Sequence, residues 1–510
     1  MRPDIETDFL VIGSGAGGSV VAYHLARANE RVVVLERGKW IRPEDMSENE
    51  LEQITSMYKD GGSQTNTEAD MFVLQGQVVG GSTVLSNAVC FRLPEDVRRN
   101  FANQGFELPL RELTRAYERC EDVLNVHLLE DEVYNPAAYR MMDGMRELGL
   151  KPGRFPKAML DCIGCGYCNM GCRYGRKLDA SMTWVPMAVN RGAEILPESE
   201  ALKIEVKNGA VTGVLCRDHR DGSTFRVKAK RYVLSGGAIN TPELLLKSKI
   251  LPDRAGHRTS FNAGGIIFAE YDEPVDGFDG DQMCVHHITH SYAIEQVHNP
   301  PLSFAMTMPG WFERHHNDLG RYRNLTSAGV LVPTQPVGQV LVGLGHKVIK
   351  RLFNHADFKF DLPGQDMHVL RTGLKQLMRI YLASGARRVI TPAHKYTEVT
   401  DIKDVDVIDS VIRSQRDIVG FGSSHPQGGA CLGDSAARDV VTPDFNVQGI
   451  ENLFVADASL FPRSIRVNPM LTIMAVAEMA ACKIGNLTPP DKIEEGIAWD
   501  ARQRVASAAT

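Results

Sequence analysis

The sequence predicts an α/β fold organised around a Rossmann-like nucleotide-binding domain. An apolar strand at residues 8–12 runs into the glycine turn GSGAGG at residues 13–18. A helical stretch follows at residues 19–28, and a second apolar strand at residues 31–35 ends on Glu36. This order of strand, glycine turn, helix, strand and acid is that of a dinucleotide-binding βαβ unit.

The glycines and the acid have separate tasks in such a unit. Gly13 makes the turn, Gly15 lets the backbone approach a pyrophosphate, and Gly18 lets the helix pack on the strand. The amino end of the helix then faces the phosphates. Glu36 is placed to accept the hydroxyls of an adenosine ribose, and its charge disfavours a 2′-phosphate. The alternative is a glycine-rich turn in another kind of α/β protein.

Composition narrows the class of protein. The 510 residues include 24% charged and 43% hydrophobic residues and carry a net charge of −6, which gives no electrostatic reason to expect nucleic acid. No apolar run reaches the length of a membrane span. The chain begins with MRPDIETDFLVIG and enters a strand without a basic and apolar leader, so we expect a cytoplasmic protein. Residues 346–353, HKVIKRLF, are expected to form a solvated surface helix, with a peripheral membrane contact as the alternative.

The segments after the first βαβ unit are predicted in chain order. Residues 40–75 are polar and are expected to form a loop over the nucleotide, and residues 110–150 are expected to be helical. Between them, Gly80, Gly81 and Ser82 look like a second loop of close backbone approach.

A cysteine-rich loop follows at residues 161–177, DCIGCGYCNMGCRYGRK. Its cysteines have the spacing C-x₂-C-x₂-C-x₃-C that bacterial ferredoxins use for a cubane cluster, although Arg173 stands where a ferredoxin has proline. A zinc site, a pair of disulfides and four free thiols are the alternatives. We predict one iron–sulfur cluster, [4Fe–4S] or [3Fe–4S], with the metal ligands Cys162, Cys165, Cys168 and Cys172.

The middle of the chain combines strands with two helices. Residues 194–234 alternate apolar and polar side chains in short runs, which predicts a β-meander. A buried strand, a glycine turn and a helix opened by Thr241 and Pro242 follow. Residues 260–345 are strand-like and rich in aromatic residues, Met and Pro, which suits the lining of a substrate cavity, and residues 366–385 form one helix.

The last block adds three signals. Residues 420–433 read GFGSSHPQGGACLG and contain His425, and a strand further on ends at Asp457. Asn468 precedes Pro469, which keeps Asn468 out of helical geometry, and Pro469 can occupy the first position of the helix that follows.

Together these pieces resemble the glucose–methanol–choline (GMC) flavoprotein oxidoreductases over nearly the whole chain. GSGAGG with Glu36, VVGGST, GGAINTPELLLKS and the terminal HP and NP pairs occur in the order of that family. The cysteine loop, the PVDGF segment and the ASGARRV helix end are similar to long-chain-alcohol-oxidising members that carry a comparable Cys-rich insert. The resemblance implies FAD as cofactor and a Rossmann-like FAD-binding domain joined to a discontinuous β-sheet substrate-binding domain.

The resemblance also implies roles for individual residues. His425 and Asn468 would form the catalytic pair. The family pattern places Asn where this chain has Ser86, with Asn87 one residue later, so which of the two side chains meets the flavin is open. The residues implied to hold FAD are Gly13, Gly15, Gly18, Glu36, Gly80, Gly81, Ser82, Asn87, Asp457, Pro469 and Met470.

The same resemblance divides the chain into four parts. The FAD-binding domain is expected to be discontinuous, and a short tail is expected to end the chain. The parts are residues 1–110, 190–260 and 415–490 for the FAD-binding domain, 111–189 for a helical segment with the cysteine loop, 261–414 for the substrate-binding domain and 491–510 for the C-terminal tail.

These elements predict an FAD-dependent dehydrogenase for a bulky, mostly apolar alcohol. The imidazole of His425 would accept the hydroxyl proton, Asn468 would hold the alcohol, and the flavin N5 atom would accept the hydride. Electrons would leave through the cluster to an external acceptor protein or quinone. An O₂-reducing oxidase with a structural cysteine loop, and a non-catalytic redox sensor or assembly subunit, are the alternatives.

Overall fold

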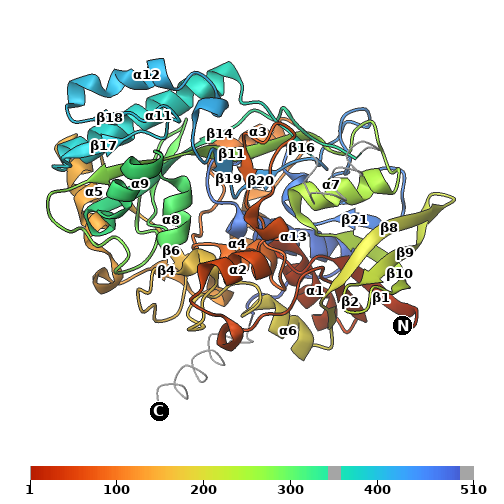
Figure 1. Ribbon diagram of the computed structural model, residues 1–510. Helices are drawn as coiled ribbons and strands as arrows, with labels where there is room; N and C mark the ends of the chain where they lie inside the picture. The colour runs from red at the N-terminus through yellow and green to blue at the C-terminus, as the bar shows by residue number, and fades with distance from the viewer. Residues whose placement is uncertain (1, 343–357, 494–510) are drawn as a thin grey trace, which may run out of the picture.

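The computed structural model describes residues 2–342 and 358–493. Figure 1 shows its two sheets, with helices packed around them. The predicted surface helix at residues 346–353 lies outside the described residues. Within the described ranges, no helix combines the length and the apolar character that a membrane crossing requires. The cytoplasmic location stays a prediction.

The first sheet is the Rossmann-like one. Its strands are β1 (Ile5–Ile12), β2 (Val32–Leu35), β7 (Glu194–Leu196), β8 (Ser199–Lys207), β9 (Ala210–Asp218), β10 (Thr224–Leu234) and β21 (Leu453–Val455). They are ordered β7-β2-β1-β10-β9-β8, and β21 pairs with β10. The pairs β7–β2, β2–β1, β1–β10 and β10–β21 are parallel, whereas β9 and β8 add an antiparallel extension.

The strands β1 and β2 have apolar sequences because helices cover both faces of the sheet and bury their side chains. All four residues of β2 are buried, as expected for a parallel strand covered on both faces. Among the covering helices are α1 (Ala16–Arg27), α6 (Trp184–Asn190) and α13 (Met470–Gly485), and α1 packs on both others. Helix α4 (Leu110–Val123) packs on the outer side of α13. The predicted α/β class is therefore confirmed.

The second sheet is larger and mixed. Its main path is formed by β16 (Phe358–Lys359), β15 (Gly338–Val340), β11 (His257–Glu270), β14 (Leu325–Pro333), β13 (Ala293–Gln296), β12 (Val285–Ile288) and β5 (Gly153–Arg154). Joined to this path are β3 (Phe72–Val73), β17 (Arg388–Ile390), β18 (Glu398–Val399), β19 (Gly422–Ser423) and β20 (Pro426–Gln427). The long strand β11 runs antiparallel to β14, with pairs from Asn262↔Pro333 to Glu270↔Leu325.

Helices cover this sheet as well. Helix α11 (Gly364–Ala383) packs against β14 and against α5 (Pro136–Glu147). The short strands β4 (Val126–Leu128) and β6 (Pro156–Ala158) form a separate antiparallel pair. Further helices in the described ranges include α2 (Glu50–Met57), α3 (Glu95–Ala102), α8 (Pro301–Thr307), α9 (Phe312–Leu319) and α12 (Ile408–Val411).

Two local predictions are corrected. Residues 40–75 are not only a loop, because they contain helix α2, whose N-cap Asn49 accepts a hydrogen bond from the Glu52 N–H at 3.2 Å. Helix α7 (Gly237–Lys247) begins at Gly237 and not at Thr241. The Thr241 hydroxyl does not cap the helix there, because it donates a hydrogen bond to Asp457 Oδ2 at 2.6 Å.

Candidate active site

A cavity of about 650 Å³ is lined by residues of both sheets. Strand ends Ile12 and Leu35 come from the first sheet, and Gly264 and Leu331 come from the second. The carboxyl ends of parallel strands are where open α/β sheets bind their ligands. The sheet order thus places a ligand site at this cavity.

Two glycine turns approach each other at the edge of the cavity. Gly13 has φ +103°, and a Cβ there would lie 2.3 Å from the Ser235 carbonyl oxygen. A Cβ on Gly81 would lie 2.8 Å from the Gly15 Cα. Only glycine fits both places, so the two turns pack closely on neighbouring backbone at the edge of the cavity. Gly18 serves packing, since its Cβ would lie 1.9 Å from the Gly13 oxygen.

The second turn is fixed to the first by side chains. The Gly80 N–H donates to Ser14 Oγ at 3.0 Å, and Ser14 Oγ donates to Glu36 Oε2 at 2.7 Å. Ser82 lines the cavity, and its Oγ accepts from the Gly76 N–H at 2.9 Å. Gly15 and Gly81 line the cavity, whereas Gly18 and Gly80 are not among its lining residues.

Glu36 lies at the end of β2 and lines the cavity. Its Oε2 also accepts from the Ser14 N–H at 3.1 Å, and its Oε1 accepts from the Gly38 N–H at 2.9 Å. Burial raises the pKa of Glu36. The carboxylate therefore holds the glycine turn, and its predicted contact with a ribose stays a prediction.

Asp457 follows β21 and organises the start of α7. Its Oδ2 accepts from the Gly237 N–H at 2.8 Å and its Oδ1 from the Ser459 N–H at 2.7 Å. Burial raises the pKa of Asp457. Asp457 also lines the cavity, and its predicted contact with FAD stays a prediction.

The amino end of α13 opens onto the same cavity. Pro469 is its N-cap, and Pro469, Met470 and Ile473 line the cavity. Ser86 and Asn87 face this end, with Ser86 Oγ at 3.8 Å from Met470 Sδ. A helix amino end favours negative charge.

His425 and Asn468 are brought together, as the sequence predicted. His425 Nε2 lies 3.3 Å from Asn468 Nδ2, and both residues line the cavity. The Ser423 hydroxyl oxygen accepts from the His425 N–H at 3.0 Å and fixes the backbone. Burial lowers the pKa of His425 to about 4, so the imidazole is neutral near pH 7 and can accept a proton.

Unpaired polar atoms at this end of the cavity indicate a missing ligand. Among the described residues, Asn87 Oδ1, His425 Nδ1 and Asn468 Oδ1 are buried without a hydrogen-bond partner. Buried polar atoms are normally satisfied, so these three fit a site completed by a bound molecule.

Glu295 is a site residue that sequence reasoning missed. It lies on β13, is 5% exposed and lines the cavity. Burial raises the pKa of its carboxyl to about 7, against a hydrogen bond with the Asn468 side chain that lowers it. The sequence feature that could have revealed Glu295 is an acidic residue inside the largely apolar strand AIEQV at residues 293–297.

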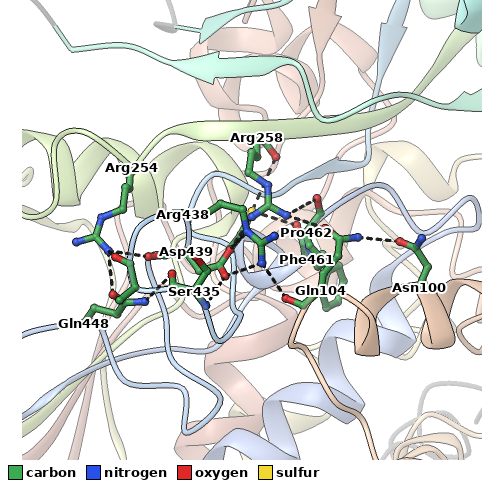
Figure 2. A network of polar contacts seen from close by, with 12 residues as sticks. Asn100, Gln104, Arg254, Arg258, Ser435, Arg438, Asp439, Gln448, Phe461 and Pro462 are labelled. Atoms are coloured by element: carbon green, nitrogen blue, oxygen red, sulfur yellow. Dashed lines mark hydrogen bonds and ion pairs between the residues drawn. The ribbon is translucent and has the colours of Figure 1, made fainter.

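A polar network around the buried Asp439 joins the segments next to those that carry His425 and Asn468, and Figure 2 shows this network. Asp439, which is 0% exposed, accepts from Arg258 at 2.7 Å and from Arg438 at 2.9 Å. Arg258, at the start of β11, also donates to the Pro462 carbonyl oxygen at 3.4 Å. The network thereby ties the chain after His425 and the chain before Asn468 to β11.

Replacing Asp439 by asparagine is expected to lower the free energy of unfolding by about 1–3 kcal/mol at pH 7, because Arg258, whose side chain is 19% exposed, loses its buried anionic partner. Burial acts to raise the pKa of Asp439, but the Arg438 guanidinium and the Ser435 N–H hold that pKa below its ordinary value. The carboxylate therefore stabilises the fold above the pKa of an unfolded aspartate, and this stabilisation is lost as the pH falls through the folded pKa. Urea unfolding of both proteins at pH 7 and in acid measures the difference.

Asp444→Asn provides the matched control. The Asp444 side chain is 83% exposed and pairs with Lys483 at 3.1 Å, so its loss should cost about 0–1 kcal/mol. Equal effects of the two substitutions would contradict the role given to Asp439.

The described residues give no support for the predicted metal centre in the cysteine loop. No group of three or more His, Cys, Asp or Glu side chains in residues 2–342 and 358–493 is placed to hold a metal ion. Cys168 Sγ faces Asp281 Oδ1 at 3.8 Å, Cys172 Sγ accepts from the Arg176 N–H at 3.3 Å, and Cys165 lines a second cavity of about 240 Å³. The iron–sulfur prediction for Cys162, Cys165, Cys168 and Cys172 is therefore not supported, and we derive no electron path through them.

The glycine turns of a dinucleotide-binding fold and a His–Asn pair line the same cavity. This combination is that of a nucleotide-dependent oxidoreductase. The GMC oxidoreductase family models match residues 54–261 and 352–477, and a model of the NAD(P)-binding Rossmann-like domain matches residues 11–41. The chain belongs to the GMC oxidoreductase family, and membership supports FAD as the cofactor.

Relatives extend over most of the chain. An uncharacterized GMC-type oxidoreductase of Mycobacterium tuberculosis is 29% identical and aligns with 92% of this chain and 75% of its own. The long-chain-alcohol oxidase FAO4B of Arabidopsis thaliana is 26% identical and aligns with 94% of this chain and 67% of its own. A cholesterol oxidase of Acinetobacter baumannii is 24% identical over 93% of this chain and 94% of its own.

Solved structures share the fold. Pyridoxine 4-oxidase from Mesorbium loti superposes with a TM-score of 0.72 at 17% identity and covers 95% of this chain and 100% of its own. A formate oxidase superposes with a TM-score of 0.72 at 15% identity and covers 95% of this chain and 99% of its own.

Proposed function

We propose that the protein oxidises a bulky, mostly apolar alcohol to an aldehyde or ketone with FAD as the hydride acceptor. The observation that carries the proposal is the 3.3 Å contact between His425 Nε2 and Asn468 Nδ2 in the cavity that also holds the glycine turns. The alcohol class is supported by the names of the long-chain-alcohol and cholesterol oxidases among the relatives. It is further supported by the apolar lining residues Phe72, Val89, Met170, Met283, Val297, Met306 and Leu331.

The residues of the cavity suit FAD. Gly13, Gly15 and Gly81 line the cavity where a pyrophosphate would lie, and the amino end of α13 suits the end of the ring that becomes negative. Asn87 Oδ1, which is buried and unpaired among the described residues, is free to meet a donor of the ring. When bound, FAD supplies a hydride acceptor at its N5 atom.

The chain's own residues handle the hydroxyl proton. Asn468 and His425 hold the alcohol oxygen between them, and the neutral imidazole takes the hydroxyl proton as the hydride leaves the carbinol carbon. The Glu295 carboxylate, hydrogen-bonded to Asn468, compensates the positive charge that forms on the imidazole. The apolar walls exclude water from the reacting atoms.

The pH dependence of flavin reduction tests the part assigned to Glu295. Because its pKa is raised to about 7, the carboxyl is protonated below that pH and no longer compensates the imidazolium. The rate of anaerobic flavin reduction by alcohol should therefore rise about tenfold as the pH increases through 7. Glu295→Gln should remove this rise and keep the low rate at all pH values, as stopped-flow absorbance would show.

Glu273→Gln serves as the control, because the Glu273 side chain is 81% exposed and its ion pair with Arg140 is long, at 3.6 Å. It should keep the wild-type pH profile. An unchanged profile in Glu295→Gln would contradict the assignment.

For the electron acceptor we infer oxygen, because five of the proteins compared with this chain are named oxidases of long-chain alcohols or of cholesterol. An external carrier is the second candidate, because Asn169 and Met170 of the cysteine loop line the substrate cavity. Purified protein with a long-chain primary alcohol should release one H₂O₂ per aldehyde in air. Turnover with a quinone or dye under nitrogen, without peroxide in air, would instead make the protein a dehydrogenase.

A further inference from the structure

Behind the cavity lies a buried cation that the reaction described above does not use. Lys177 is 1% exposed, and its ammonium donates hydrogen bonds to three backbone carbonyl oxygens. These belong to Val84 at 2.5 Å, Ser86 at 2.9 Å and Cys168 at 2.5 Å. All three N–H groups are thus satisfied, but each partner is a neutral carbonyl.

A second buried lysine nearby shows the contrast. The Lys157 ammonium donates to the Asn87 carbonyl oxygen at 2.8 Å and forms an ion pair with Asp281 at 2.8 Å. That pair is electrically neutral as a unit. Lys177 makes no such close ion pair: in the described part of the chain its hydrogen bonds go to the three carbonyls. The buried Asp179 carboxyl accepts from the Ser181 hydroxyl at 2.6 Å, and the nearby Lys177 charge acts to lower the pKa of Asp179 against the burial that raises it.

The carbonyls that Lys177 holds belong to the loop in front of the proposed flavin. Leu85, Ser86 and Asn87 line the cavity, and Ser86 faces Met470 at the amino end of α13. Lys177 therefore stands directly behind this loop, outside the reach of substrate. Its third bond, to Cys168, fixes the cysteine loop to the same point.

A buried charge without a close ion pair is costly, and the three hydrogen bonds of the Lys177 ammonium to carbonyls offset part of that cost. Its electrostatic effect is correspondingly strong, because the protein interior screens charge less than water does. A flavin gains negative charge when it accepts a hydride, so a fixed positive charge stabilises the reduced form more than the oxidised form.

We propose that Lys177 is a positioning residue whose ammonium, acting through the backbone of residues 84–86, raises the reduction potential of the bound flavin and so favours hydride transfer from the alcohol. The proposal rests on the FAD site of the proposed function. It adds a role for a residue that contacts neither substrate nor, through its own side chain, the cavity.

The test is the reduction potential of FAD in the purified holoenzyme, measured by anaerobic dye titration. Lys177→Met and Lys177→Gln should both make the potential more negative, with a shift equivalent to about tenfold in the equilibrium constant for flavin reduction. Lys177→Arg keeps the charge and should restore the wild-type potential. The double variant Lys157→Met/Asp281→Asn is the matched control, because it removes a buried pair without changing net charge and should leave the potential unchanged.

Three results would overturn the proposal. One is a wild-type potential in a Lys177→Met or Lys177→Gln protein that holds its full FAD content. Another is an equal shift in the Lys157→Met/Asp281→Asn control. The third is loss of folding in both neutral variants, which would give the charge a structural role. Because dye titration uses no alcohol, a failure of the proposed function would appear separately, as a flavin that dyes reduce and alcohols do not.

Discussion

Replacing His425 by alanine is expected to slow the reduction of bound flavin by an alcohol by about 10²–10⁴-fold, because the hydroxyl proton then has no acceptor. The imidazole is neutral near pH 7, since burial lowers its pKa to about 4, and its Nε2 is held 3.3 Å from Asn468 Nδ2. The rate constant is measured by mixing the FAD-loaded protein with a saturating alcohol in an anaerobic stopped-flow instrument. FAD content should stay at the wild-type value, because the glycine turns that receive the pyrophosphate are elsewhere.

His290→Ala is the control for this substitution. The His290 side chain is 92% exposed and is not part of the cavity lining, so its removal should leave the rate unchanged. A His425→Ala protein that reduces its flavin at the wild-type rate would exclude this imidazole as the proton acceptor.

Replacing Gly13 by alanine is expected to lower the FAD content of the purified protein by about tenfold or more. A Cβ at this position would lie 2.3 Å from the Ser235 carbonyl oxygen, and the backbone has φ +103°, which alanine adopts only under strain. The turn must therefore move away from the place where it faces Gly81. The flavin absorbance per chain after gel filtration is the measurement.

Gly364→Ala is the matched control, because Gly364 begins helix α11 and is not among the residues that line the cavity. A Cβ at Gly364 meets no heavy atom within 4 Å, so the substitution should preserve both FAD content and thermal stability. If Gly13→Ala also retained stoichiometric FAD, the glycine turn would not be the pyrophosphate site.

The parts of this molecule that follow from local backbone constraints were predictable from sequence. The turn at Gly13, the helix after it and the acid at Glu36 depend on residues close in the chain, and their spacing alone indicates the βαβ unit. The helix was predicted at residues 19–28 and lies at Ala16–Arg27, because its first turn begins within the glycine motif. The His425 and Asn468 pair was predicted through the family resemblance, because no local pattern says that residues 43 positions apart meet.

The parts that depend on tertiary surroundings were not predictable. Glu295 acquires its raised pKa only when β13 carries it into the interior beside Asn468. Thr241 looked like a helix cap, but a partner 216 residues away, Asp457, takes its hydroxyl. The cysteine spacing indicated a cluster, yet spacing does not fix where each sulfur points, and Cys168 turns toward Asp281 in the interior.

The central claim is that an alcohol delivers its carbinol hydrogen to a flavin held beside His425. Its most direct test is the visible absorbance of the FAD-loaded protein under nitrogen after addition of a panel of long-chain, aromatic and sterol alcohols. We expect at least one of these alcohols to bleach the flavin band within seconds in the wild-type protein, and the His425→Ala protein to retain its colour over the same time. A wild-type protein with full FAD content that no alcohol in the panel bleaches would contradict the account.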